Sequence, residues 1–258
     1  MQMRFHPSKC KVMHLGSNNP RYNYYMYDNY TETTCDQHTL DKTLLEKDLG
    51  VFIDKDLEFT MHTIAKVNKA HQLLGYVRHT FRYLNKGSLP MLYKSIIRPH
   101  LEFASCVWSP KHRINIHRVE SIQRRATKCI PELQHLTYEQ RLANLKLETL
   151  SYRRMRADLI ETYRIVNNLH ELDKSCCCSR CPNKSMLTIN PCRSTRGNSK
   201  KIQLQHTTKE RAHFFENRIV KFWNNLSESA VSSKNVTIFK NRIDKELGHL
   251  KYNADFLY

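Results

Sequence analysis

The sequence predicts a mainly α-helical protein with a small antiparallel β element at its N-terminal end. Between about residues 60 and 170, apolar residues recur every three or four positions, which is the period of one helix face. Before residue 60, short aromatic and β-branched runs alternate with turn residues, as in strands. Glycine is scarce at 6 residues, and the closest two, Gly75 and Gly87, are 12 positions apart. This spacing excludes a G-x-G-x-x-G dinucleotide turn and a P-loop.

Three strand-like runs are expected in residues 1–60. Residues 10–15 end at the Gly-Ser-Asn-Asn-Pro turn of residues 16–20, and residues 22–27 form a short aromatic run. Residues 49–53 form the third run, and acidic residues follow it at Asp54, Asp56 and Glu58. We interpret these three acids as a solvated turn rather than a metal site. Together the runs indicate a small antiparallel β unit.

Five helical regions are expected after residue 60. The first is about six turns long and buries Ile64, Val67, Ala70, Leu74, Val77, Phe81 and Leu84. The second begins near Ser88 with Pro90 in its first turn, and Pro99 ends or kinks it at Arg98. The third covers residues 114–130 with Ile116, Val119, Ile122 and Ala126 facing inward. Thr137 and Gln140 predict a capped helix start, with Leu142, Leu145 and Leu150 inward. Residues 152–169 continue this helical period.

The last third of the chain has a different sequence pattern. Residues 171–207 lose helical periodicity, and they combine a cysteine-dense patch with a basic, Ser/Thr-rich linker. A final pair of helices is expected at about 208–226 and 236–250. No internal repeat is visible in the sequence.

The chain carries 42 Lys+Arg against 24 Asp+Glu, a formal net charge of +18. Six basic residues between 109 and 128 face only one acid, Glu120. A second cluster comprises Arg141, Lys146, Arg153, Arg154 and Arg156, and residues 193–221 add eight more basic residues. On amphipathic helices these clusters predict a continuous positive surface opposite the apolar stripe. Such a surface favours a nucleic-acid partner, bound in a salt-sensitive way.

Five of the 9 cysteines fall within residues 176–192. Cys178 and Cys181 form one C-x-x-C half of a possible zinc site, but Cys192 has no partner cysteine at two to four residues. We therefore favour a cysteine-rich surface loop, with zinc unlikely. The odd, clustered cysteines do not indicate a disulfide framework. With neither a signal peptide nor an apolar run of about 18 residues, an intracellular, nuclear or cytoplasmic protein without membrane contact is expected.

Several stretches, taken in order, resemble one known family. The most specific are residues 92–103 (LYKSIIRPHLEF) with 107–110 (VWSP), preceded by 5–16 (FHPSKCKVMHLG), 46–54 (EKDLGVFID) and 62–81. The match continues through six further stretches: residues 116–128, 138–142, 153–160, 194–197, 214–226 and 239–240. In order and spacing they resemble the distal part of reverse transcriptases from jockey-like non-LTR retrotransposons. The similarity extends over nearly the whole chain, and the cysteine cluster falls in a stretch that varies in the family.

This resemblance implies four regions. Residues 1–60 correspond to a palm remnant with a hairpin like the primer grip, and residues 61–170 to a helical thumb-like domain. Residues 171–207 correspond to a Cys-rich, basic variable linker, and residues 208–258 to a C-terminal helical segment. Lys9 resembles a palm lysine, and the primer end is held at Leu49, Gly50 and Val51. By the same resemblance the template–primer backbone is tracked by Arg78, Lys94, Arg98, Arg124 and Arg125.

Polymerases of this family hold two Mg²⁺ ions with three carboxylates, two of them in a Tyr/Phe-Ala-Asp-Asp hairpin. The resemblance places these elements before residue 1, and this sequence contains no such hairpin. The run 252–256 (YNADF) has one carboxylate and lies in the C-terminal tail. The implied function is therefore binding of an RNA and DNA template–primer without polymerisation, with no catalytic residue, cofactor or small-molecule substrate. The alternatives are a host-retained interaction protein and a zinc-binding nucleic-acid module. RNA or DNA preference and oligomeric state stay open.

Overall fold

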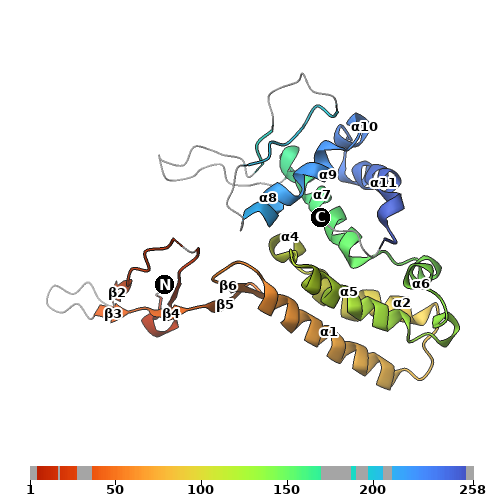
Figure 1. The fold of residues 1–258 in the computed structure, drawn as a ribbon, viewed down its shortest axis with the longest axis horizontal. Coiled ribbons are helices and arrows are strands. Elements are labelled where there is room, and N and C mark those ends of the chain that lie inside the picture. The colour runs from red at the N-terminus through yellow and green to blue at the C-terminus, as the bar shows by residue number, and fades with distance from the viewer. Residues whose placement is uncertain are drawn as a thin grey trace, which may run out of the picture. The chain divides into compact units, whose positions relative to one another are not determined.

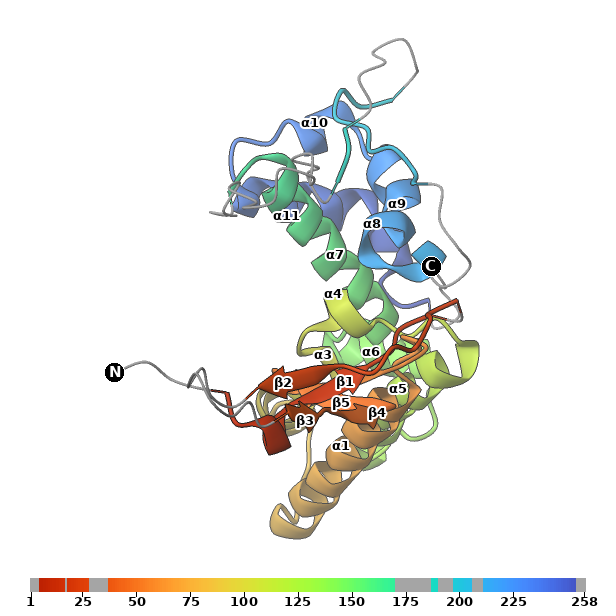
Figure 2. The same ribbon diagram turned by 90° about the vertical axis from the view of Figure 1, so that its left-hand side faces the viewer.

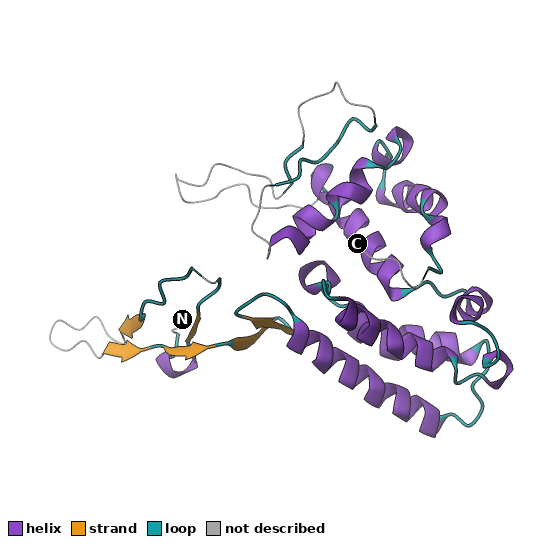
Figure 3. Ribbon diagram, viewed as in Figure 1, coloured by secondary structure: helices purple, strands orange, loops and turns teal. Residues whose placement is uncertain are grey.

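A computed structural model of the protein describes residues 5–16, 18–27, 37–169, 187–189, 197–205 and 211–253. Helices form most of the ordered structure, and the named strands all precede residue 55 (Figures 1 and 3). A mainly α fold with a small β element is therefore confirmed. The chain divides into two compact units, Met1–His62 and Thr63–Tyr258. Within the described residues, no helix has both the length and the apolar composition needed to cross a membrane.

Three two-stranded sheets form the first unit, after a short 3₁₀ turn at Pro7–Lys9. Their strands are β1 (Lys11–Met13), β2 (Tyr25–Tyr27), β3 (Gln37–Thr39), β4 (Asp41–Thr43), β5 (Leu45–Asp48) and β6 (Val51–Asp54). The pairs β2–β3 and β5–β6 are antiparallel, but β1 and β4 are parallel. The expectation of a purely antiparallel element was therefore wrong. The long connection between β1 and β4 contains β2 and β3, which lets β4 return in the direction of β1.

A two-residue turn joins β5 to β6. Its residues Leu49 and Gly50 have φ angles of +43° and +86°. Positive φ at both central positions is the mark of the tight hairpin turn that matches the twist of the paired strands. The predicted strand over residues 49–53 therefore begins only at Val51. The role of Gly50 is to permit this turn, whereas Leu49 adopts an uncommon conformation for a residue with a side chain.

Asp54 organises the connection from β6 to the first helix. Its carboxylate accepts hydrogen bonds from the backbone N–H groups of Asp56, Glu58 and Phe59, at 3.2, 3.0 and 2.7 Å. The interpretation of this acidic stretch as a turn is confirmed. Buried His62 adds a second link, because its Nδ1 accepts a hydrogen bond of 3.1 Å from the backbone N–H of Phe52.

The second unit is helical (Figures 1 and 2). Its α-helices are α1 (Thr60–Thr80, which starts in the first unit), α2 (Ser88–Leu92), α3 (Arg98–Glu102), α4 (Ser105–Trp108), α5 (Arg113–Thr127), α6 (Tyr138–Leu145), α7 (Leu150–Val166), α8 (Phe215–Arg218), α9 (Val220–Asn224), α10 (Glu228–Val231) and α11 (Val236–Glu246). Single 3₁₀ turns lie at Pro131–Leu133, Arg211–His213 and Gly248–Leu250.

Helix α1 buries four residues of the predicted stripe: Val67, Ala70, Leu74 and Val77. It ends at Thr80, so the expected extension through Phe81 to Leu84 was wrong. The Asn85 side chain explains the change of direction, since its Oδ1 accepts hydrogen bonds from the backbone of Gly87 and Ser88, at 2.9 and 2.8 Å. This local turn competes with continued helix.

The second predicted helix does not stop at Arg98. Between α2 and α3 the chain makes a π-helical turn over Tyr93–Ile97, where the N–H of Arg98 bonds to the carbonyl of Tyr93. Pro99 has no N–H and its ring crowds the preceding turn, so a widened turn is a common way to accommodate it. Pro99 therefore does not end the helical path, which runs on to Glu102.

A buried polar network joins α5, α6 and the start of α7. The Glu120 side chain, 2% exposed, accepts hydrogen bonds from the Tyr138 hydroxyl and from the backbone N–H of Leu150, the latter at 3.0 Å. Gln123 donates to the Tyr138 hydroxyl at 3.0 Å and to the carbonyl of Glu148 at 2.9 Å. Burial raises the pKa of Glu120, while the Tyr138 hydrogen bond and the nearby Arg154 charge oppose this shift.

Most of the helix predictions in this part are confirmed. Helix α5 buries Ile116, Val119, Ile122 and Ala126. Thr137 and Gln140 form the predicted capping box of α6. Leu150 belongs to α7, because Lys146 adopts a left-handed conformation that ends α6. The predicted ends at residues 130 and 169 were wrong, since α5 ends at Thr127 and α7 at Val166.

The C-terminal helices gather around α7 (Figures 1 and 2). The single helix expected over residues 208–226 is broken into the short helices α8 and α9, whereas α11 matches the second expected helix. Tyr163 of α7 stacks on Phe239 of α11, with ring centroids 4.4 Å apart, and Trp223 of α9 packs on Phe239. A buried ion pair of 2.9 Å between Arg218 of α8 and Asp158 of α7 adds to this contact.

The expected linker of residues 171–207 lies largely outside the described residues. Its described parts pack against the helical core: Leu187 and Ile202 are buried, and Ile189 pairs with Ile202 in a β-bridge. Gly197 has a φ of +120°, and a Cβ atom there would lie 2.7 Å from the Lys201 side chain. The end of the flexible Lys201 side chain could move aside, so it is the positive φ that favours glycine at this position.

The ion pair between Arg156 of α7 and Asp244 of α11 gives a testable pH dependence. Asp244 accepts two hydrogen bonds from Arg156, of 2.6 and 2.8 Å. Partial burial alone would raise the pKa of Asp244, but the Arg156 contacts outweigh it and lower the pKa below its ordinary 3.8. A carboxyl with a lowered folded-state pKa stabilises the fold above the unfolded value, and this is lost as the pH falls through the folded value.

We predict that Asp244→Asn lowers the free energy of unfolding by about 1 kcal/mol at pH 7, and that the difference from wild type shrinks as the pH falls below 3.8. Urea unfolding at several pH values measures this. Glu132→Gln is the control, since it breaks an exposed ion pair with Lys86 and should cost little at any pH. A penalty for Asp244→Asn that does not change with pH would contradict the prediction.

Candidate nucleic-acid interface

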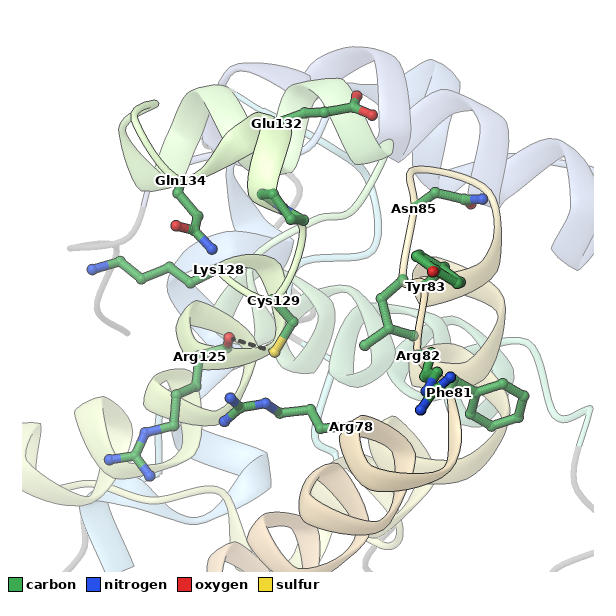
Figure 4. A pocket seen from close by; sticks show the side chains of 12 residues that line it. Arg78, Phe81, Arg82, Tyr83, Asn85, Arg125, Lys128, Cys129, Glu132 and Gln134 are labelled. Atoms are coloured by element: carbon green, nitrogen blue, oxygen red, sulfur yellow. Dashed lines mark hydrogen bonds between the residues drawn. The ribbon is translucent and has the colours of Figure 1, made fainter.

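A groove lies where the ends of α1 and α5 come together, and we call it the α1–α5 groove. Its volume is about 590 Å³. Figure 4 shows Arg78, from the last turn of α1, across from Arg125 and Cys129 at the end of α5. The remaining lining residues are Phe81, Arg82, Tyr83, Leu84, Asn85, Lys128, Pro131, Glu132 and Gln134. The groove is thus built by two helices and the two turns that follow them.

Positive charge dominates this groove. Four basic side chains line it, at Arg78, Arg82, Arg125 and Lys128, and all four are exposed. Glu132 is the single acid among the described lining residues, and Lys86 pairs with it at 3.1 Å. Uncompensated charges of one sign in a concave surface concentrate the electrostatic field and attract polyanions.

The pKa values of two titratable groups are shifted by this positive charge. Burial lowers the pKa of His71 on α1, and the positive charge of Arg125 lowers it further. Burial raises the pKa of the Cys129 thiol, and the charge of Arg78 partly opposes that shift. The pKa of a side chain on α1 is therefore shifted by a charge on α5, and the pKa of a side chain just after α5 is shifted by a charge on α1. The raised pKa also makes Cys129 a poor thiolate nucleophile at neutral pH.

A second hollow, of about 420 Å³, adjoins the α1–α5 groove and shares Arg125 and Lys128 with it. Arg124 and Arg141 line it, and the Arg124 guanidinium lies over the Tyr138 ring, 4.3 Å from its centroid. Such a cation–π contact fixes the position of the guanidinium while leaving it charged. Arg124 therefore extends the positive surface along α5.

Two exposed aromatic side chains stand at the α1 edge of the groove. Phe81 is 43% exposed and Tyr83 is 87% exposed. Base stacking on aromatic rings beside a basic groove is a common way of holding an unpaired nucleotide. The groove can therefore offer both phosphate contacts and stacking surfaces.

The structure brings together three of the residues implied by the family resemblance: Arg78, Arg124 and Arg125. Lys94 is exposed on the π-helical turn and does not line the groove. Arg98 is half-buried, and its guanidinium lies 3.6 Å from the Glu102 carboxylate. These two side chains are thus apart from the α1–α5 groove.

The other implied residues lie in the first unit. Lys9 ends the 3₁₀ turn and is exposed. Leu49 is 88% exposed at the tip of the β5–β6 hairpin, next to Gly50. Val51 begins β6 and is only 5% exposed.

The expectation of one continuous positive surface over three clusters was wrong for the second cluster. Arg141 and Arg154 are buried. Arg153 binds Glu102 and Glu148, and Arg156 binds Asp244. These side chains face contacts inside the helical unit: Arg141 bonds to the Thr127 hydroxyl and the Leu136 carbonyl, and Arg154 bonds to the Ser151 hydroxyl. Their charge holds the helices together and is not presented to a partner.

Reasoning from sequence missed four residues of the groove: Arg82, Tyr83, Lys128 and Phe81. Lys128 was counted in a basic cluster but not chosen as a site residue. Phe81 was assigned to the buried face of α1 because it continues the apolar period. A usable signal was the Asn-Lys-Gly-Ser run at residues 85–88, which indicates a turn and thus an earlier helix end.

A metal site finds no support in the described part of the chain. There, no group of three or more His, Cys, Asp or Glu side chains could hold a metal ion. The weak zinc candidates Cys178, Cys181 and Cys192 lie outside the described residues.

Comparison with models of protein families, with curated proteins and with solved structures finds no match.

The coupling between Arg125 and His71 can be measured. We predict that Arg125→Ala raises the pKa of His71, because the positive charge that disfavours the protonated imidazole is gone. Titration of the imidazole resonances by NMR gives this pKa directly. Lys245→Ala, which removes an exposed charge on α11, should leave it unchanged. An unchanged His71 pKa in Arg125→Ala would mean that Arg125 does not face α1.

Proposed function

We propose that this chain binds a nucleic-acid template–primer without polymerising, as a part of a jockey-like non-LTR retrotransposon RNA-directed DNA polymerase. The observation that carries the proposal is the charge of the α1–α5 groove, where four basic side chains face one acid that is already paired. A partner of this kind implies a nuclear or cytoplasmic site of action.

Phosphate recognition needs what this groove provides. Lys and Arg side chains neutralise backbone phosphates and release condensed counterions, which makes the affinity fall steeply with salt. Arg78, Arg125 and Lys128 are exposed and keep their charge available. By contrast, the buried arginines of α6 and α7 make contacts inside the protein, so their charge is not presented to a partner. The α1–α5 groove is therefore the best-supported binding surface.

The family resemblance supports the same surface. Four residues of the groove, Arg78, Phe81, Arg125 and Lys128, belong to residues 62–81 and 116–128, two stretches that resemble the thumb of the polymerase. In this proposal residues 61–170 act as the thumb-like domain, and residues 1–60 are a palm remnant whose β5–β6 hairpin corresponds to the primer grip. In the C-terminal segment, helices α9 and α11 then support the thumb by packing on α7.

The absence of polymerisation is proposed from the sequence. The chain contains no Ala-Asp-Asp hairpin, and the carboxylate of Asp54 is committed to three backbone N–H groups. In this proposal the chain binds a template–primer and does not catalyse polymerisation.

Binding of a labelled RNA–DNA primer–template over a salt series tests the proposal. We predict that Arg125→Ala with Lys128→Ala weakens binding and reduces the slope of log K against log salt by roughly two, close to one for each lost phosphate contact. The control combines Lys234→Ala with Lys245→Ala, which removes the same charge from exposed positions near and on α11. This control should leave most of the slope intact.

Two other results would contradict the proposal. Equal losses in both double variants would mean that net charge, and not the groove, governs binding. No binding at low salt would leave the alternative of an interaction protein without a nucleic-acid partner. A primer-extension assay alongside tests the second half of the proposal, since extension by this chain alone would overturn the argument from missing carboxylates.

A further inference from the structure

A small cavity outside the α1–α5 groove lies between the connection from α4 to α5 and the turn that leads into α8. Its volume is about 100 Å³. Lys111 and Arg113 line it from one side, and His213 and Arg218 from the other. None of its described lining residues is acidic. The cavity is therefore a second concentration of positive charge, separate in position and much smaller.

Ser109 gives the cavity an unsatisfied polar atom. Its hydroxyl oxygen is buried, lines the cavity and has no hydrogen-bond partner among the described residues. A buried hydroxyl that makes no hydrogen bond costs free energy and is uncommon in folded proteins. A ligand with acceptor oxygens placed in the cavity would supply the missing partner.

Arg218 is held rigidly at the base of this site. Its side chain is 5% exposed and donates to Asp158 at 2.9 Å, to the carbonyl of Cys106 at 2.8 Å and to the carbonyl of His213 at 3.3 Å. These contacts fix the guanidinium and the backbone around it. The half-buried Lys111 and the exposed Arg113 line the cavity beside this fixed guanidinium and can contact a ligand that enters it.

The start of α5 adds to the positive potential. Arg113 is the first residue of this 15-residue helix, and the preceding His112 makes no side-chain capping hydrogen bond. The N-terminal end of a helix carries partial positive charge and unpaired N–H groups. Burial lowers the pKa of His213, and the positive charges of Lys111, His112 and Arg218 lower it further.

We propose that this cavity is a binding site for a single phosphate group, bound by Lys111 and Arg113 with the Ser109 hydroxyl donating to a phosphate oxygen. Organic ligands need pockets of roughly 300–1,000 Å³, whereas a water molecule takes about 30 Å³ of liquid volume. A cavity of about 100 Å³ thus suits one tetrahedral oxyanion and excludes a whole nucleotide. The group can be inorganic phosphate or the terminal phosphate of a strand whose remainder lies outside.

Isothermal titration with inorganic phosphate tests the site, in a chloride medium held at constant ionic strength. We expect saturable binding of one phosphate per chain. Lys111→Ala with Arg113→Ala should weaken it by roughly tenfold or more, because charge-assisted hydrogen bonds are lost. Ser109→Ala, which removes one atom and leaves the charges, should weaken it less. Lys234→Ala with Lys245→Ala is the charge-matched control and should bind phosphate as wild type does.

The outcomes separate the alternatives. Absence of saturable binding, or equal affinity in wild type and the Lys111→Ala, Arg113→Ala variant, would overturn the proposal. Competition by a 5′-phosphorylated dinucleotide but not by its unphosphorylated form would identify a strand end as a source of the ligand. Phosphate binding without such competition would identify the free anion. Arg125→Ala with Lys128→Ala should leave phosphate affinity unchanged. The test of this site is therefore independent of the test of the α1–α5 groove.

Discussion

The buried carboxylate of Glu120 is the constraint on which the helical unit depends. Removing a carboxylate from water is costly unless hydrogen bonds and opposite charge compensate it. Here the Tyr138 hydroxyl of α6 and the first N–H of α7 supply the hydrogen bonds, and Arg154 supplies the charge. Gln123, one turn further along α5, binds the same tyrosine and the carbonyl of Glu148. Three helices are thereby fixed at one point.

This constraint also decides what α5 presents to solvent. With Glu120, Gln123 and Thr127 buried on one side of the helix, Arg125 and Lys128 are exposed three residues apart, on a common face. The ends of α1 and α5 then bring these charges together with Arg78. Farther along, acids on other helices neutralise Arg153, Arg156 and Arg218. The same excess of basic residues therefore has two uses: internal ion pairs around α7 and an open positive groove.

Periodicity and capping were sufficient to predict the buried faces of α1 and α5 and the start of α6 from sequence, but not every helix end. The inward residues of α1 and α5, and the capping box of α6, depend on neighbours within a few positions and were predicted correctly. The parallel pairing of β1 with β4, the ion pair of Arg153 with Glu102 and that of Arg156 with Asp244 join residues far apart in the chain, and the expectations from sequence were wrong there. Of the α1–α5 groove, Arg78 and Arg125 were chosen in advance, as was Arg124 of the adjoining hollow. Phe81 was misassigned because nothing in the apolar period marks where α1 ends.

The central claim is that nucleic acid lies in the α1–α5 groove. Photo-crosslinking measures this most directly, with a p-benzoylphenylalanine substituted for Tyr83 at the groove edge and, in a second protein, for Tyr252 beyond α11. Both positions are exposed tyrosines, 87% at Tyr83 and 37% at Tyr252, so the same residue type is replaced in each protein. The account predicts that a labelled RNA–DNA duplex crosslinks at position 83 in low salt, that crosslinking fades as salt rises, and that position 252 gives little product. Equal crosslinking at both positions, or none at position 83, would contradict it.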